Sequence, residues 1–124
     1  MPTASLCDRP QNMSRPPINL FSPVPPPPGG ERFDRLADFG NVEIERIVSA
    51  ANAPPADYCQ EHDEWVVLLV GEAEISVDGQ SVLLQAGDHL MLPARTPHTV
   101  LRSSEGAVWL AVHQGRQSGH EEHK

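Results

Sequence analysis

Short runs of alternating apolar and polar residues, separated by turn dipeptides, constrain the fold of this chain more than any other feature. In residues 72–77 (Glu-Ala-Glu-Ile-Ser-Val) every second side chain is apolar, which is the period of a strand with one buried face. Asp78-Gly79 follows, a dipeptide favoured in two-residue hairpin turns, and residues 81–84 are expected to form the second strand of the hairpin. No stretch shows the periodicity of an amphipathic helix. We therefore expect an all-β domain.

Further runs of this kind extend the prediction to roughly six or seven short strands with the spacing of an antiparallel sandwich or barrel. Residues 64–70 are apolar on both faces, which is typical of a strand buried between two sheets or at a subunit contact. A chain this short buries only a modest fraction of its surface by itself. Because residues 64–70 are apolar on both faces, we expect a homodimer to bury the rest. The other predicted strands are residues 42–48, 72–77, 81–84, 89–92, 98–102 and 107–113.

Proline divides the chain, because nine of its 13 prolines fall within residues 1–30. Proline removes a backbone donor and favours an extended conformation, so this part cannot form a ladder or a helix. We expect residues 1–30 to be a flexible leader, residues 31–115 the barrel and residues 116–124 a polar flexible tail. The spaced prolines of residues 23–28 also suit a proline-recognising domain, although a solvated spacer is the simpler interpretation.

The charge balance excludes several classes of partner. Aspartate and glutamate total 17 and lysine plus arginine 9, a net charge of −8. Non-specific binding to nucleic acid or anionic membrane requires a basic face, and a membrane helix requires roughly 20 apolar residues. The first residues lack the features of a secretory signal, and Cys7 and Cys59 are too few for a disulfide framework. We therefore expect a cytoplasmic protein that binds neither nucleic acid nor membranes.

Two segments resemble the sequence motifs of the cupin superfamily. Glu64 and Gly71, with six residues between them, match the second half of the first motif, which reads His-x-His, three or four residues, Glu, six residues, Gly. Gly87, Pro93 and His98 match the second motif, which reads Gly, five residues, Pro-x-Gly, two residues, His. The resemblance implies a small single-domain cupin, an antiparallel β-barrel of the jelly-roll type.

The resemblance also implies a metal site, and here the sequence departs from it. In most cupins the two first-motif histidines, the glutamate and the second-motif histidine hold one divalent metal ion. Tyr58 and Gln60 replace the first two histidines, in a run that resembles a Tyr-x-Gln-x-x-Asp-Glu-Trp variant of the motif. We predict Gln60, Glu64 and His98 as ligands of iron, manganese, zinc, nickel or copper. An oxygen-rich set of this kind should bind the ion more weakly than three histidines.

Tyr58 and His62 are the candidate catalytic residues. Strand parity places Tyr58, Gln60, His62 and Glu64 on one face if no bulge intervenes. Either candidate could transfer a proton beside a metal ion. Tyr58 could instead ligate the metal as a phenolate or hydrogen-bond to Glu64, and His62 could be a further ligand or lie outside the site. His113 is interpreted as structural.

Three arginines, Arg46, Arg95 and Arg102, are the cations nearest to the predicted barrel. Parity places Arg102 on the face of His98, where it would favour an anionic substrate. An ion pair with one of the many acidic groups is the alternative.

Two classes of function follow from the resemblance. The first is a metal-dependent dioxygenase, isomerase or lyase acting on a small molecule, anionic if an arginine faces the pocket. The second is a non-catalytic module that binds or senses a small molecule with a degraded metal site. Fold alone does not decide between them.

Overall fold

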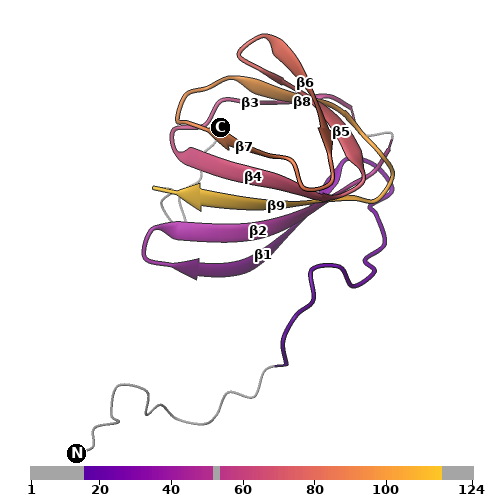
Figure 1. Ribbon diagram of the computed structural model, residues 1–124. Helices are drawn as coiled ribbons and strands as arrows, with labels where there is room; N and C mark the ends of the chain where they lie inside the picture. The colour runs from indigo at the N-terminus through magenta and orange to yellow at the C-terminus, as the bar shows by residue number, and fades with distance from the viewer. Residues whose placement is uncertain (1–15, 52–53, 116–124) are drawn as a thin grey trace, which may run out of the picture.

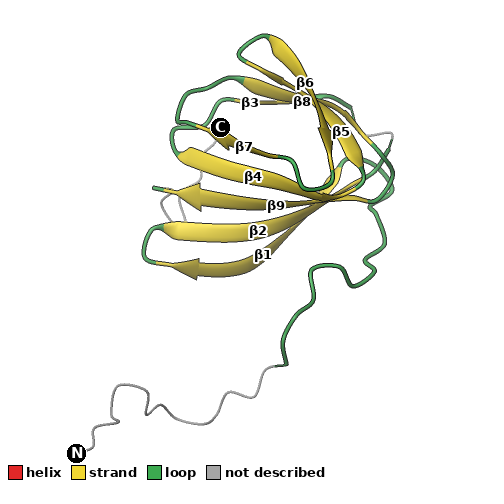
Figure 2. Ribbon diagram, in the orientation of Figure 1, coloured by secondary structure: helices red, strands yellow, loops and turns green. Residues whose placement is uncertain are grey.

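The computed structural model describes residues 16–51 and 54–115, and within them the chain forms nine strands and no helix. All paired strands are antiparallel and form two sheets, in the orders β1-β2-β9-β4-β7 and β3-β8-β5-β6. Figures 1 and 2 show the two sheets facing each other. The predicted all-β antiparallel barrel is confirmed. The strands are β1 (Glu31–Phe39), β2 (Val42–Ser49), β3 (Ala56–Tyr58), β4 (Asp63–Val70), β5 (Glu72–Val77), β6 (Gln80–Gln85), β7 (His89–Leu92), β8 (His98–Ser103) and β9 (Ala107–Gln114).

The predicted leader lies partly and the predicted tail wholly outside the described residues, since these exclude residues 1–15 and 116–124. Residues 16–30 form neither strand nor helix. The described part of the chain has no helix that is long and apolar enough to cross a membrane.

Seven strands lie where alternation predicts them, and β1 and β3 are additional. The register of β1 is irregular between Arg35 and Ala37, so its apolar residues do not keep one period. β3 has only three residues, which is too short for a pattern. The predicted hairpin turn is present, with φ of 54° at Asp78 and 85° at Gly79, as a turn with two left-handed central residues requires.

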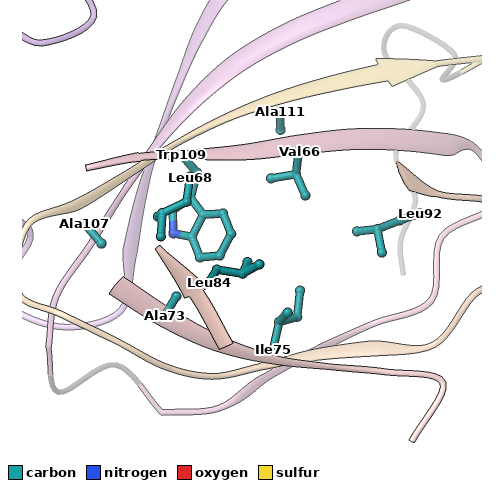
Figure 3. Packing of buried hydrophobic residues seen from close by; sticks show 9 residues of the cluster. All are labelled: Val66, Leu68, Ala73, Ile75, Leu84, Leu92, Ala107, Trp109 and Ala111. Atoms are coloured by element: carbon teal, nitrogen blue, oxygen red, sulfur yellow. The ribbon is translucent and has the colours of Figure 1, made fainter. Parts of the chain in front are cut away.

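The core lies between the sheets, where inward side chains of β4, β7 and β9 meet those of β5 and β6. Figure 3 shows Trp109 among these side chains, and its side chain is almost fully buried. Val66, Ile75, Leu92 and Trp109 also line the pocket described below, so the core supports the site. The nine core residues are Val66, Leu68, Ala73, Ile75, Leu84, Leu92, Ala107, Trp109 and Ala111.

Strand β2 directs the polar side chain of Glu45 into the barrel. Glu45 and Ile47 line the pocket between the sheets, whereas Arg46 and Val48 lie in a groove on the outer face, beside residues 20–24. Arg46 is buried there and pairs with Asp34 of β1, at 3.1 Å between Nη2 and Oδ2. Alternation along the strand therefore brings a carboxylate, that of Glu45, to the inside.

The outer face of the five-stranded sheet is largely apolar. Inward side chains of β4 and β9 are buried, and the side chains that alternate with them are only half-buried. The two-sided apolar pattern of residues 64–70 thus corresponds to a core face and a partly exposed outer face. Half-buried apolar side chains on this outer face are Ile44, Trp65, Val67, Leu69, Val108, Leu110 and Val112.

Candidate functional site

A pocket of about 60 Å³ lies between the two sheets. Half of its lining is apolar, which provides a dry wall behind the polar groups. The apolar lining consists of Phe33, Ile47, Val66, Ile75, Leu92, Val100 and Trp109. The polar lining consists of Glu31, Glu45, Tyr58, Gln60, Glu64, His98 and His113.

Glu64 of β4 and His98 of β8 approach each other from opposite sheets. Glu64 Oε1 lies 3.9 Å from His98 Nε2, and the two side chains are only 10% and 6% exposed. This distance is too long for a direct hydrogen bond. It is less than twice the roughly 2.1 Å of a bond from a metal ion to nitrogen or oxygen, so both atoms can reach one ion.

The backbone fixes the orientation of the His98 ring. His98 Nδ1 lies 3.1 Å from the carbonyl oxygen of Thr96, which can only accept, so Nδ1 carries a proton and donates it. Nε2 is consequently the ring nitrogen presented to Glu64. Histidines that ligate metal ions are commonly held by a carbonyl in this way.

Tyr58 packs beside His98 and hydrogen-bonds to Glu31. Its hydroxyl donates to Glu31 Oε1 at 3.1 Å, and the Ser49 hydroxyl donates to Glu31 Oε2 at the same distance. Burial, followed by the negative charge of Glu31 and its hydrogen bond, raises the pKa of Tyr58 far above its ordinary value. The phenol therefore stays protonated in the metal-free protein. Its hydroxyl partner is Glu31, not Glu64.

Gln60 follows β3 and lines the same pocket as Glu64 and His98. Its backbone carbonyl accepts from the amide of Arg95 at 2.6 Å, which ties this segment to the loop before β8. The described residues contain no group of three His, Cys, Asp or Glu side chains that could hold a metal ion. A third protein ligand beside Glu64 and His98 would therefore be the Gln60 amide.

His62 does not line the pocket but contacts a residue that does. Residues 59–62 are not a strand, so the parity argument fails there. His62 Nε2 lies 2.8 Å from His113 Nδ1, and His113 Nε2 donates to Glu45 Oε2 at 2.9 Å. A neutral His113 with its proton on Nε2 accepts from His62 at Nδ1. His62 is thus linked to the pocket through His113.

Sequence reasoning missed three polar residues of the pocket: Glu31, Glu45 and His113. His113, interpreted above as structural, is almost fully buried and also lines the pocket. A signal for it exists, because it shares the parity of Trp109 in a strongly alternating strand. Pairing between strands decides where β1 forms and which side chains of β2 face inward. A local sequence pattern carries no information about such pairing.

Of the two alternatives for Arg102, the ion pair with an acidic group is confirmed, and the side chain does not face the pocket. The register between β5 and β8 shifts between Glu74 and Ile75, so that Leu101 has no partner and the parity counted from His98 no longer holds. Arg102 is exposed and contacts Glu74 at 3.0 Å. The other two arginines considered above are also paired, Arg95 with Glu61 at 2.8 Å and Arg46 with Asp34 at 3.1 Å.

Comparison with known proteins agrees with this architecture. The family model of the cupin domain matches residues 45–113. A crystal structure of a candidate mannose-6-phosphate isomerase from Ralstonia eutropha is 35% identical, has a TM-score of 0.74, and aligns over 82% of this chain and 100% of that one. No curated protein matches.

Two more distant structures show the same fold. KdgF from a Halomonas species is 18% identical with a TM-score of 0.67, over 72% of this chain and 82% of that one. An RmlC-like cupin from Shewanella frigidimarina is 18% identical with a TM-score of 0.68, over 82% of this chain and 91% of that one.

Proposed function

Because this chain belongs to the cupin family, we propose that its pocket binds one divalent metal ion and, beside it, a small organic molecule. The observation that carries the proposal is the opposed pair of Glu64 and His98, 3.9 Å apart and almost fully buried. Imidazole and carboxylate together suit iron, manganese, zinc, nickel and copper. A bound ion would offset the cost of burying the Glu64 carboxylate.

Gln60 is the proposed third ligand, since it lines the same pocket and its side-chain oxygen can coordinate. A neutral amide in place of a histidine lowers the affinity, so we expect the ion to be exchangeable. When bound, the ion would supply Lewis-acid chemistry in a pocket with one dry wall.

Tyr58 and His62 are the proposed acid–base residues. The protonated Tyr58 hydroxyl, held by Glu31, is a hydrogen-bond donor at the pocket wall. His62 would exchange protons with the pocket through His113, to which it is hydrogen-bonded. Among dioxygenase, isomerase and lyase, the similarity to the candidate isomerase favours the isomerase class.

A second candidate function is a non-catalytic module that binds or senses a small molecule. It is favoured because the described residues contain no group of three His, Cys, Asp or Glu side chains that could hold a metal ion. In that case the pocket would hold an organic ligand without a metal ion.

The metal content of purified protein distinguishes the two. We would compare the wild type, His98→Ala and the matched control His89→Ala, since His89 is an exposed histidine that contacts Trp65 outside the pocket. Near-stoichiometric metal in the wild type and the control, with at least a tenfold loss in His98→Ala, is expected. A metal-free wild type whose melting temperature is unchanged by divalent ions would favour the binding module.

A cytoplasmic location and a homodimer remain predictions. The partly exposed apolar outer face of the five-stranded sheet supports the second, because isolated monomers seldom expose a contiguous apolar patch of this kind.

A further inference from the structure

The pocket is acidic, and no lysine or arginine is among its lining residues. Glu31, Glu45 and Glu64 are among its 14 lining residues, whereas lysine and arginine are absent from that described set. The only lining groups that can become cationic are His98 and His113. A ligand entering this space meets three carboxylates from three different strands.

Within residues 16–51 and 54–115, Glu31 is held by neutral donors only. Its two oxygens accept from the hydroxyl groups of Ser49 and Tyr58, both at 3.1 Å. The neighbouring Arg32 pairs with Asp34 at 3.1 Å instead. The hydroxyl groups orient the Glu31 carboxylate and leave its charge uncompensated.

Glu45, on the neighbouring strand β2, is held in a similar way. Its carboxylate accepts from the buried His113, whose second nitrogen is engaged by His62. With a neutral His113, this chain of hydrogen bonds also orients a carboxylate without cancelling its charge. Two fixed acceptors, Glu31 and Glu45, thus remain even when Glu64 is assigned to a metal ion.

Aromatic side chains complete the surroundings of these carboxylates. Phe33, Tyr58 and Trp109 line the same pocket, and Phe33 is half exposed. Aromatic faces attract cations and pack against short alkyl chains, whereas they offer nothing to a carboxylate or phosphate. The three arginines that could have received an anion are paired elsewhere, as described above.

We infer that the organic molecule bound in this pocket carries a protonated amine, which Glu31 and Glu45 receive, and not an anionic group. The inference rests on the proposed function for the pocket as a small-molecule site, and it does not require the metal ion. A volume of about 60 Å³ limits the buried part to a short alkylammonium group. This replaces the anionic substrate that an inward Arg102 would have favoured.

Three probes of one size and different charge test this inference: n-propylammonium, 1-propanol and propionate. The indole N–H signal of Trp109 in a nitrogen–proton correlation spectrum reports on the pocket wall. The indole of Trp65, the only other tryptophan, lies next to His89 outside the pocket and is the internal control. Each probe is titrated into metal-free and zinc-loaded protein, and mannose 6-phosphate is added as a larger anion.

We expect propylammonium to shift the Trp109 signal and to bind at least fivefold more tightly than propanol, with propionate and the sugar phosphate weaker still. Glu31→Gln and Glu45→Gln keep the size of the side chain and one accepting oxygen but remove the charge, and each should weaken propylammonium binding at least fivefold. Glu72→Gln, the same change at an exposed position outside the pocket, should not.

Tighter binding of propionate or mannose 6-phosphate than of propylammonium would overturn the inference. So would propylammonium binding that is equal in the wild type and both pocket variants, or no shift of Trp109 at any concentration that leaves Trp65 unchanged. Zinc uptake is measured in the same samples and should persist in Glu31→Gln. A wild type that takes up no zinc but binds propylammonium would refute the metal proposal alone.

Discussion

The phenol ring of Tyr58 lies nearly parallel to the imidazole ring of His98, with ring centroids 5.3 Å apart and 19° between the planes. The stack restrains one face of the imidazole, while the Thr96 carbonyl oxygen holds Nδ1. Two constraints on one ring direct Nε2 toward Glu64. Tyr58 is therefore a positioning residue for His98, in addition to its proposed role in proton transfer.

This stack predicts different effects for two substitutions of Tyr58. Tyr58→Phe keeps the ring and should change zinc affinity by less than about threefold. Tyr58→Leu removes the ring and should weaken zinc binding by about 10–100-fold, the usual effect of losing a group that orients a ligand. Competition with a chromophoric chelator measures both affinities. Equal affinities in the two variants would show that the stack does not position His98.

The raised pKa of Tyr58 predicts a loss of stability in alkaline solution. In the unfolded chain the phenol loses its proton near its ordinary pKa of 10.0, while the folded protein retains it. The unfolded state then binds fewer protons, so the free energy of unfolding falls as pH rises above about 10. Below that pH the contribution is fully present.

Tyr58 is the only tyrosine, so the tyrosinate absorbance band reports on this group alone. We expect it to appear only together with unfolding, and we expect Tyr58→Phe to lose stability less steeply above pH 10. A tyrosinate band that appears at the ordinary pKa in folded protein would contradict the burial of the phenol and its contact with Glu31.

The part of the site that could be predicted is the part encoded by spacing. Glu64, Gly71 and His98 occupy fixed positions relative to turns and strand starts, so motif spacing finds them. Parity, by contrast, requires a regular strand. It failed for His62, because residues 59–62 are not a strand, and for Arg102, because of the register shift at Leu101.

Glu31 and Glu45 illustrate what local patterns lack. Glu31 reaches the pocket from an edge strand with an irregular register, and Glu45 lies in a strand whose inward phase depends on pairing with β9, more than sixty residues away. Long-range pairing decided which side of β2 faces the barrel, and with it the charge of the pocket.

Gly71 should tolerate alanine poorly, and the structure gives the reason. Its φ is +93°, and an added Cβ would collide with the Ser104 hydroxyl and lie 3.1 Å from Ala107 Cβ. Gly79 has a similar φ of +85° but open space around it. We expect Gly71→Ala to lower the free energy of unfolding by more than about 2 kcal/mol and Gly79→Ala by about 1 kcal/mol. Urea denaturation measures both, and equal losses would argue against the collision.

The pair of Asp34 and Arg46 predicts a pH-dependent contribution to stability. Burial alone would raise the pKa of Asp34, but hydrogen bonds from Arg32 and Arg46 and their charges outweigh it and hold the pKa below its ordinary 3.8. The contribution is present above that pH and is lost as the pH falls through the lowered value. Asp34→Asn should therefore lower the free energy of unfolding by about 1–2 kcal/mol at neutral pH, and less below pH 3.8.

The control for Asp34 is Asp38→Asn. Asp38 pairs with Arg35, and both side chains are more than half exposed, so the loss should stay below about 0.5 kcal/mol. Denaturant titrations at neutral and acid pH measure the two variants. A loss for Asp34→Asn that is independent of pH would mean that packing, and not the ion pair, accounts for it.

The apolar outer face of the five-stranded sheet predicts a homodimer. Leu110 of β9 lies near its centre, because its register partners are Arg46 of β2 and Val67 of β4. A second copy covering this face would bury the half-exposed side chains around it, which is favourable by about 25 cal/mol per Å² of apolar surface. Light scattering after size exclusion should therefore give twice the 13.6 kDa chain mass.

Leu110→Lys would place a charge in the interface and should yield monomer. The control is Leu83→Lys, at a position 66% exposed on the other sheet, which should leave the dimer intact. A monomeric wild type, or a dimer that persists in Leu110→Lys, would exclude this face as the contact.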